Sequence, residues 1–280
     1  VHETFQRKGS QLRDAVRRKD DVVGSTAVFQ RVGAGVATTK ARHGTITPMN
    51  QTHAAPSATL ADFYAGDWVD RLDEAKTNIN ERDVIASGGA MALGRKVDDQ
   101  ITTILDTTTA TVITLTVTSK ATINATFIQW CEAAWAANVP NDGEVYGILT
   151  PRAWSQLSII DAFSRSDYVG FEGLPYKQGV TTGQKWKDWN GIKWKMQTGM
   201  PSATTSTAKC WIWHKSAIGY ASAKAAGNIA GNGSVAADIT WHGDRAAHFV
   251  NHSMSGGAVL IDTTGVIEAT LDDTAAIVVS

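Results

Sequence analysis

The sequence predicts an α+β protein built as one large unit or two interlocked units. Segments with the three- to four-residue apolar spacing of helices alternate with period-two segments that are typical of strands. The 280 residues are enough for about two packed units. Hydrophobic residues make up 43% and charged residues 19% of the chain, as in folded, water-soluble proteins.

Composition also limits the partners that the chain can have. The net charge of -1 gives no overall attraction to nucleic acid, so we expect DNA to be contacted non-specifically, if at all. No run of eighteen apolar residues and no signal-peptide core is present, so we expect no membrane partner. Cys131 and Cys210 are isolated in the sequence and are expected to be buried free thiols.

The first 19 residues are predicted to form an arm that can include a short helix and that lies on another surface. Their main apolar residues are Phe5, Leu12 and Val16, which are too few for a core of their own. Cations dominate this segment. They are Arg7, Lys8, Arg13, Arg17, Arg18 and Lys19.

Residues 24–66 predict a long two-stranded extension. Strand-like runs at residues 25–32 and 57–64 flank a loop of small and basic residues that includes Lys40 and Arg42. Such a pair of strands, with few large apolar side chains, is not stable by itself in water. We therefore expect the extension to dock on a partner surface.

An acidic stretch comes next, and it is expected to be a connection that leads to the strongest helix pattern of the chain. Asn80 fits an N-cap, and the apolar spacing predicts one helix over residues 81–105, about 37 Å long at about 1.5 Å per residue. Gly88, Gly89 and Gly94 would each cost about 1 kcal/mol inside a helix, so we expect a strand to pass close to that face. The acidic residues are Asp62, Asp67, Asp70, Asp73 and Glu74.

The rest of the chain alternates between short helices and strands. Helices are expected at residues 127–135 and 151–163, and surface loops at residues 165–190 and 227–233. Strands are expected at residues 109–118, 144–149, 192–198, 210–213, 239–254, 258–261 and 266–271.

None of the motifs that could carry chemistry is complete, so we expect no enzymatic activity, no metal and no cofactor. His248 and His252 have the spacing of a metal pair on a helix, but their segment is predicted to be a strand. Ser216 lies beside His214, yet the sequence does not identify the acid that a hydrolase would need. Residues 33–40 contain glycines and a lysine without the spacing of a phosphate-binding loop.

Four segments carry a resemblance to a known family. They are residues 6–16 (QRKGSQLRDAV), 39–44 (TKARHG), 91–99 (MALGRKVDD) and 213–220 (WHKSAIGY). Together with the order of basic arm, two-stranded extension, acidic stretch and long helix, they resemble the major capsid proteins of tailed double-stranded DNA bacteriophages. These proteins have the Hong Kong 97-like shell fold.

The resemblance implies a division of the chain into arms and domains. In this division, the N-terminal arm is residues 1–25 and the E-loop is residues 26–65. The P-domain comprises residues 66–119, which include the spine helix, and the return strands at residues 215–262. The A-domain comprises residues 120–214 and the C-terminal strand at residues 263–280.

The resemblance also implies a function. The chain would be a non-enzymatic component of the virion capsid, assembled in the host cytoplasm as pentamers and hexamers of an icosahedral head that encloses DNA. Scaffolding, portal and decoration proteins are further implied partners. A shell protein of an encapsulin-type compartment shares the fold and is the nearest alternative, and an α+β hydrolase is a more distant one.

The segregation of charge within a nearly neutral chain predicts contacts between subunits. Candidate donors are Arg7, Lys8, Arg13, Arg17, Arg18, Lys40 and Arg42, and candidate acceptors are Asp67, Asp70, Asp73, Glu74, Asp98 and Asp99. By the resemblance, the polar loop at residues 165–190 is expected at the axes of the pentamers and hexamers. Its candidate residues are Gly170, Gly173, Lys177 and Gly183.

Overall fold

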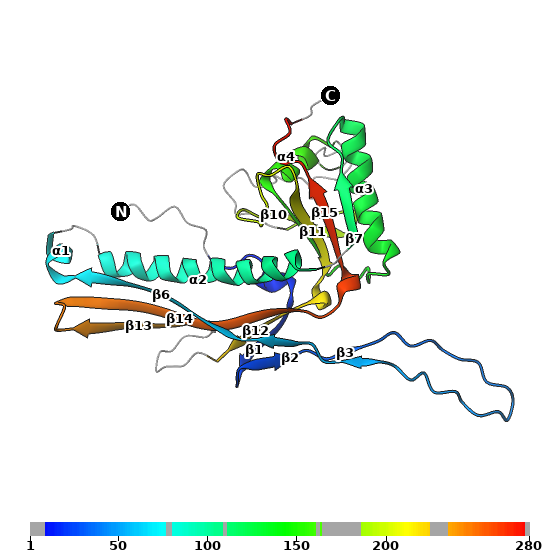
Figure 1. Ribbon diagram of the computed structural model, residues 1–280, viewed down its shortest axis with the longest axis horizontal. Helices are drawn as coiled ribbons and strands as arrows, with labels where there is room; N and C mark the ends of the chain where they lie inside the picture. The colour runs from blue at the N-terminus through cyan, green and yellow to red at the C-terminus, as the bar shows by residue number, and fades with distance from the viewer. Residues whose placement is uncertain are drawn as a thin grey trace.

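The computed structural model describes residues 9–76, 80–108, 111–160, 163, 186–224 and 235–277. These residues form two β-sheets, one long helix that lies along the first sheet, and a slender arm that projects away from the body (Figure 1). The α+β prediction is confirmed. The helices are α1 (Arg71–Lys76), α2 (Glu81–Asp106), α3 (Lys120–Ala136) and α4 (Pro151–Ile159).

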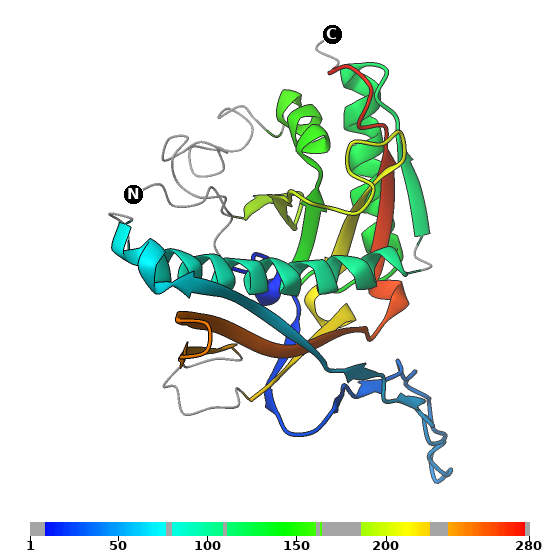
Figure 2. The same cartoon turned by 60° about the vertical axis from the view of Figure 1, so that its left-hand side comes forward.

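The first sheet has five strands in the order β1-β12-β14-β13, with β6 paired to the other edge of β14. Helix α2 lies over β14 and β6 (Figures 1 and 2), and it matches the helix that the sequence predicts to within one residue. The strands are β1 (Arg17–Val22), β6 (Ala61–Asp70), β12 (Ile218–Ala223), β13 (Val235–His242) and β14 (Ala247–Leu260).

Two expectations about this sheet are wrong. The strand expected at residues 239–254 is a hairpin, because β13 and β14 pair on either side of a turn at residues 243–246. The acidic stretch is not a connection, since its first half is the ten-residue strand β6 and its second half is α1. His248 and His252 lie on strand β14, as predicted.

The second sheet has six strands in the order β7-β15-β11-β8-β10-β9. Its core is aromatic, with Phe127 and Trp130 of α3 packed against Trp194 of β10, all fully buried. The strands are β7 (Thr111–Leu115), β8 (Val145–Leu149), β9 (Lys187–Trp189), β10 (Ile192–Met196), β11 (Ala208–His214) and β15 (Val266–Leu271). Strand β7 therefore belongs to the second sheet, where it pairs with β15, and not to the sheet that α2 covers.

Lysine 209 joins the end of α2 to the second sheet. Lys209 Nζ lies 2.8 Å from a carboxylate oxygen of Asp106 and 3.5 Å from one of Glu268, which is 4% exposed. The bond with Asp106 is the main reason that the pKa of Lys209 is raised. An acid at a helix C-terminus is unfavourable by itself, so Lys209 offsets the helix dipole while tying α2 to β11.

The long arm, residues 26–59, is held together by very short strand pairs. Strand β2 (Thr26–Val28) pairs with β5 (Ser57–Thr59), and β3 (Arg31–Val32) pairs with β4 (His53–Ala54). Residues 33–52 extend beyond these pairs, away from both sheets (Figure 1).

At two of the three glycines of α2, another part of the chain passes so close that a side chain would not fit. A Cβ atom at Gly89 would lie 2.6 Å from the His252 ring of β14, and one at Gly94 would lie 2.7 Å from the main chain of Gly9. The expectation of a passing strand is thus confirmed at Gly89, while at Gly94 it is the N-terminal segment that passes. At Gly88 nothing lies within 4 Å.

These surroundings predict opposite effects of alanine at neighbouring positions. Gly88→Ala should raise the free energy of unfolding by up to about 1 kcal/mol, since it adds helix propensity without a clash. Gly94→Ala should lower it, because the main chain of Gly9 must move away. Urea unfolding of the unassembled subunit measures both changes, and equal changes at the two positions would contradict the close approach at Gly94.

Candidate surfaces for assembly

The described residues offer no complete chemical site. They contain no group of three or more metal-ligating side chains and no helix long and apolar enough to cross a membrane. Cys131 and Cys210 are buried free thiols, as predicted. Burial is the main reason that the pKa of each thiol is raised to about 12.

The structure supplies the acid that the sequence could not identify beside His214. His214 Nε2 lies 3.1 Å from both carboxylate oxygens of Asp142, and Nδ1 lies 2.6 Å from the hydroxyl of Ser216. The backbone N–H of Ser216 also donates to Nδ1, which occupies the lone pair that a general base would use. The Glu144 backbone N–H and then His214 lower the pKa of Asp142. Asp142, His214 and Ser216 together hold the turn between β11 and β12 in place, so their role is structural.

The N-terminal segment is seated on its own subunit. Leu12, Ala15 and Val16 are fully buried in the core beneath α2, and the Trp213 indole donates a 2.9 Å hydrogen bond to the carbonyl of Ala15. A short 3-10 helix at Arg13–Ala15 matches the predicted short helix. Strand β1 follows and pairs in parallel with β12.

Asp98 anchors this segment to α2. Its carboxylate accepts hydrogen bonds from the Ser10 hydroxyl at 2.6 Å, from the backbone N–H of Gln11 at 3.0 Å and from that of Leu12 at 3.0 Å. Asp98 is 1% exposed. Its proposed role as an acceptor for a neighbouring subunit is therefore wrong, because the carboxylate is bonded inside its own chain.

The candidate donors fall into different environments. Arg13 pairs with Asp20 at 2.8 Å and Arg18 with Asp14 at 3.1 Å, both within the chain. Burial alone would raise the pKa of Asp20, but hydrogen bonds from Arg13 and Ser222 lower it below its ordinary value. Lys40 and Arg42 lie exposed on the long arm, while Arg7 and Lys8 lie outside the described residues. Arg17 contacts the root of the arm.

Four of the candidate acceptors, on β6 and α1, lie near one end of the first sheet, while Asp99 lies farther along α2. Asp67 and Asp70 of β6 are exposed, as is Asp99 on α2. Asp73 pairs with Lys76 at 3.5 Å, and Glu74 accepts a hydrogen bond from Arg82 at 2.6 Å. Gly170, Gly173, Lys177 and Gly183 of the polar loop lie outside the described residues.

Next to these acids is an aromatic surface that the sequence did not reveal. Trp68 of β6 packs on Phe249 of β14 with ring centroids 4.7 Å apart, and the Arg245 guanidinium lies 4.5 Å from the Trp68 ring centroid. Tyr64, two residues before Gly66 on the same side of β6, is 71% exposed. Helix α2 covers the opposite side of this sheet, and no described helix or strand covers this one (Figure 1). We name it the open face, and its residues are Asp62, Tyr64, Trp68, Asp70, Asp238, His242 and Phe249.

Comparison with known proteins identifies the family. The sequence profile of the phage capsid protein family matches residues 1–273, nearly the whole chain. The chain belongs to the phage capsid protein family. It is a structural component of the virion that assembles with copies of itself, and the predictions of a structural and non-enzymatic role are confirmed. No curated protein matches the chain.

Solved structures show that this phage capsid protein has the Hong Kong 97-like fold. The capsid of cyanophage P-SCSP1u aligns with a TM-score of 0.70 at 15% identity, covering 98% of this chain and 91% of that one. A chain of Mycobacterium phage Che8 aligns with a TM-score of 0.68 at 17% identity, covering 96% and 93%. The mature capsid of bacteriophage PhiM1 gives 0.68 at 11% identity, covering 97% and 89%.

Proposed function

We propose that the chain forms the pentamers and hexamers of an icosahedral phage head that encloses double-stranded DNA, and that the long arm of one subunit docks on the open face of the next. The observation that carries this proposal is the match between two surfaces that have no partner within the described subunit. Residues 33–52 contain no acidic residue, and their exposed apolar side chains include Val36, Ile46 and Met49. The open face combines carboxylates with exposed aromatic rings.

Apolar contact and charge would then act together in the shell. Burying apolar surface contributes roughly 25 cal/mol per Å² removed from water, and the opposite charges fix the register of the arm. Single exposed ion pairs are worth only about 0–1 kcal/mol. Repetition around a closed shell adds these modest contacts, since each subunit offers one arm and one open face.

Further features of the shell follow from the same proposal. The division into N-terminal arm, E-loop, P-domain and A-domain would place α2, β12, β13 and β14 in the P-domain and most strands of the second sheet in the A-domain. Its bounds would put β1 in the N-terminal arm, divide β6 between the E-loop and the P-domain, and leave β7 in the P-domain although it pairs in the second sheet. The polar loop, which was predicted at residues 165–190 and ends before strand β9 (Lys187–Trp189), would approach the axes of the pentamers and hexamers. Scaffolding, portal and decoration proteins are proposed partners, and contacts with DNA would be non-specific because the net charge is -1.

The encapsulin alternative is disfavoured by the family match over residues 1–273. The test is to purify the protein, image it by negative stain, and compare it with a variant in which a Gly-Ser linker replaces residues 33–52. We expect shells from the native chain and folded, unassembled subunits from the variant. Shells from the variant would contradict docking of the arm, and native particles that enclose a protein cargo in place of DNA would favour the compartment shell.

A further inference from the structure

The root of the long arm is a small core separate from the two large ones. Ala27, Phe29 and Ala58 of the arm pack with Ala221 and Ile261 of the body, and all five are buried. Three of these five side chains are alanines, and the half-buried Val22, Leu60 and Val259 pack against the cluster. The core fixes where the arm is attached, so contacts around it are needed to fix the direction in which the arm leaves.

Glycines in the body make room for this attachment. A Cβ atom at Gly219 would lie 2.9 Å from the Phe29 ring, and one at Gly257 would lie 2.1 Å from the carbonyl oxygen of Thr59. The arm thus sits directly against the backbone of β12 and β14. On one side, Arg31 also forms a 2.8 Å ion pair with Asp262.

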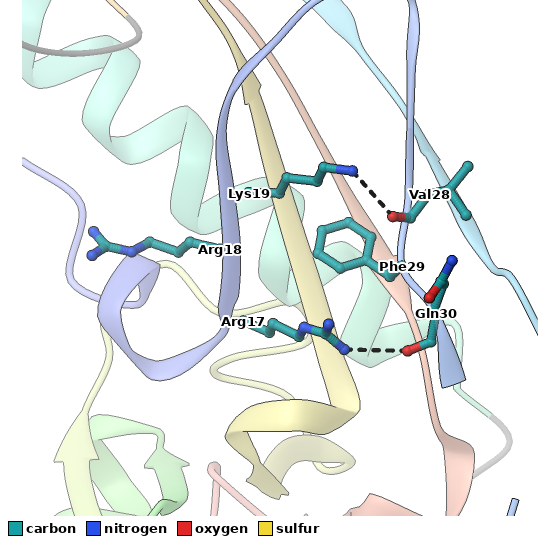
Figure 3. Close-up of a pocket in the computed structure, with 6 residues that line it drawn as sticks. All are labelled: Arg17, Arg18, Lys19, Val28, Phe29 and Gln30. Atoms are coloured by element: carbon teal, nitrogen blue, oxygen red, sulfur yellow. Dashed lines mark hydrogen bonds between the residues drawn. The ribbon is translucent and has the colours of Figure 1, made fainter. Parts of the chain in front are cut away.

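On the other side, two cations of strand β1 reach across to the arm. Arg17 Nη1 donates to the carbonyl of Gln30 at 3.3 Å, and Lys19 Nζ donates to the carbonyl of Val28 at 3.4 Å (Figure 3). The Arg17 guanidinium also lies 5.9 Å from the Phe29 ring centroid. A cavity of about 350 Å³ lies between β1 and the arm. The side chains of Arg17 and Lys19 therefore connect the two across this cavity.

Arg17 and Lys19 differ from the cation between them. Side chains alternate along a strand, and Arg18 points away from the arm in Figure 3 and pairs with Asp14. Within the part of the chain that the structure describes, neither Arg17 nor Lys19 has an ion pair with a carboxylate. Arg17 and Lys19 instead donate hydrogen bonds to two neutral carbonyls of the arm.

We propose that Arg17 and Lys19 are positioning residues for assembly, which set the direction in which the long arm leaves the subunit. The apolar root is one point of attachment. Arg17 and Lys19 supply a second on one side of it, and Arg31 supplies a third on the opposite side. The geometry makes direction important. The 13 residue-to-residue steps from Gln30 to His43 can span about 43 Å at about 3.3 Å per residue, so a rotation of about 10° at the root would move the tip by about 7 Å.

This inference is separable from the proposed function, because the direction of the arm can be measured in unassembled subunits. Spin labels at Thr38→Cys on the arm and Thr103→Cys on α2 would report the distance between arm and body, since both positions are exposed. The native Cys131 and Cys210 are fully buried and should not react with the label in the folded subunit. Pulsed electron resonance then gives the distribution of label distances.

We expect Arg17→Gln with Lys19→Gln to broaden this distribution by several ångströms, with an unchanged melting temperature. Arg18→Gln is the control, matched in charge to the single Lys19→Gln variant because each removes one cation from the same strand, and it should leave the distribution unchanged. Lys19→Arg in place of Lys19→Gln should restore part of the narrow distribution. Equal widths for the double variant and the native chain, or equal broadening by Arg18→Gln, would overturn the inference. If the double variant does not fold, the single Lys19→Gln variant decides in the same way.

Discussion

Replacing Asp98 with alanine should detach the N-terminal segment from the subunit and lower its free energy of unfolding by about 3 kcal/mol. The carboxylate accepts from the Ser10 hydroxyl and from the backbone N–H groups of Gln11 and Leu12 in a site that is almost fully buried. Without it, both N–H groups must either stay buried and unpaired or be exposed to water. The second outcome removes Leu12 from the core.

Hydrogen exchange separates this effect from general destabilisation. In the Asp98→Ala subunit the amides of Gln11 and Leu12 should exchange rapidly while those in β8 stay protected. Asp99→Ala is the control, because it makes the same change one residue along on an exposed position of α2. A loss of stability as large in the Asp99 variant as in the Asp98 variant would contradict the anchoring role.

Asp98 and Asp99 also show which features of the structure could not be predicted from the sequence. Period and propensity predict α2, the capped helix α4 and the fully buried strand β8, because these signals are local and are carried by several residues at once. Two adjacent carboxylates on a helix look alike in a sequence. Only the path of residues 9–12 across α2 makes one of them a buried anchor, and that path is a long-range contact.

The open face was missed for a related reason. The sequence predicts a strand only as far as residue 64 and an acidic connection after it, because the carboxylates there outweigh the alternation that continues from Tyr64 to Trp68. Pairing with β14 turns that alternation into one side of a sheet, and Gly66 leaves room for the Phe249 ring, which would lie 2.6 Å from a Cβ atom at that position. Sequence patterns predicted which segments lack a core of their own, but not the surfaces that complete them.

Reversing the charge of the arm should abolish assembly at physiological salt, and reversing the open face as well should restore it. The first variant is Lys40→Glu with Arg42→Glu, and the second adds Asp70→Lys with Asp238→Lys, which are both on the open face. All four side chains are exposed, so the fold of the subunit should tolerate both variants. The neutral variant Lys40→Gln with Arg42→Gln should fall between the native chain and the reversed one.

The expected size of this effect follows from turning attractions into repulsions at every copy of the contact. Two pairs that change from about 1 kcal/mol favourable to about 1 kcal/mol unfavourable shift each contact by about 4 kcal/mol. Since 1.4 kcal/mol is a factor of ten, the protein concentration needed for assembly should rise by roughly three orders of magnitude. In 1 M salt the Debye length falls to about 3 Å, so the reversed variant should recover some assembly while the native chain loses some. Sedimentation velocity measures the particle yield in each case. Equal yields from the native and reversed chains at low salt, or no recovery when both surfaces are reversed, would show that the arm does not dock on the open face through these charges.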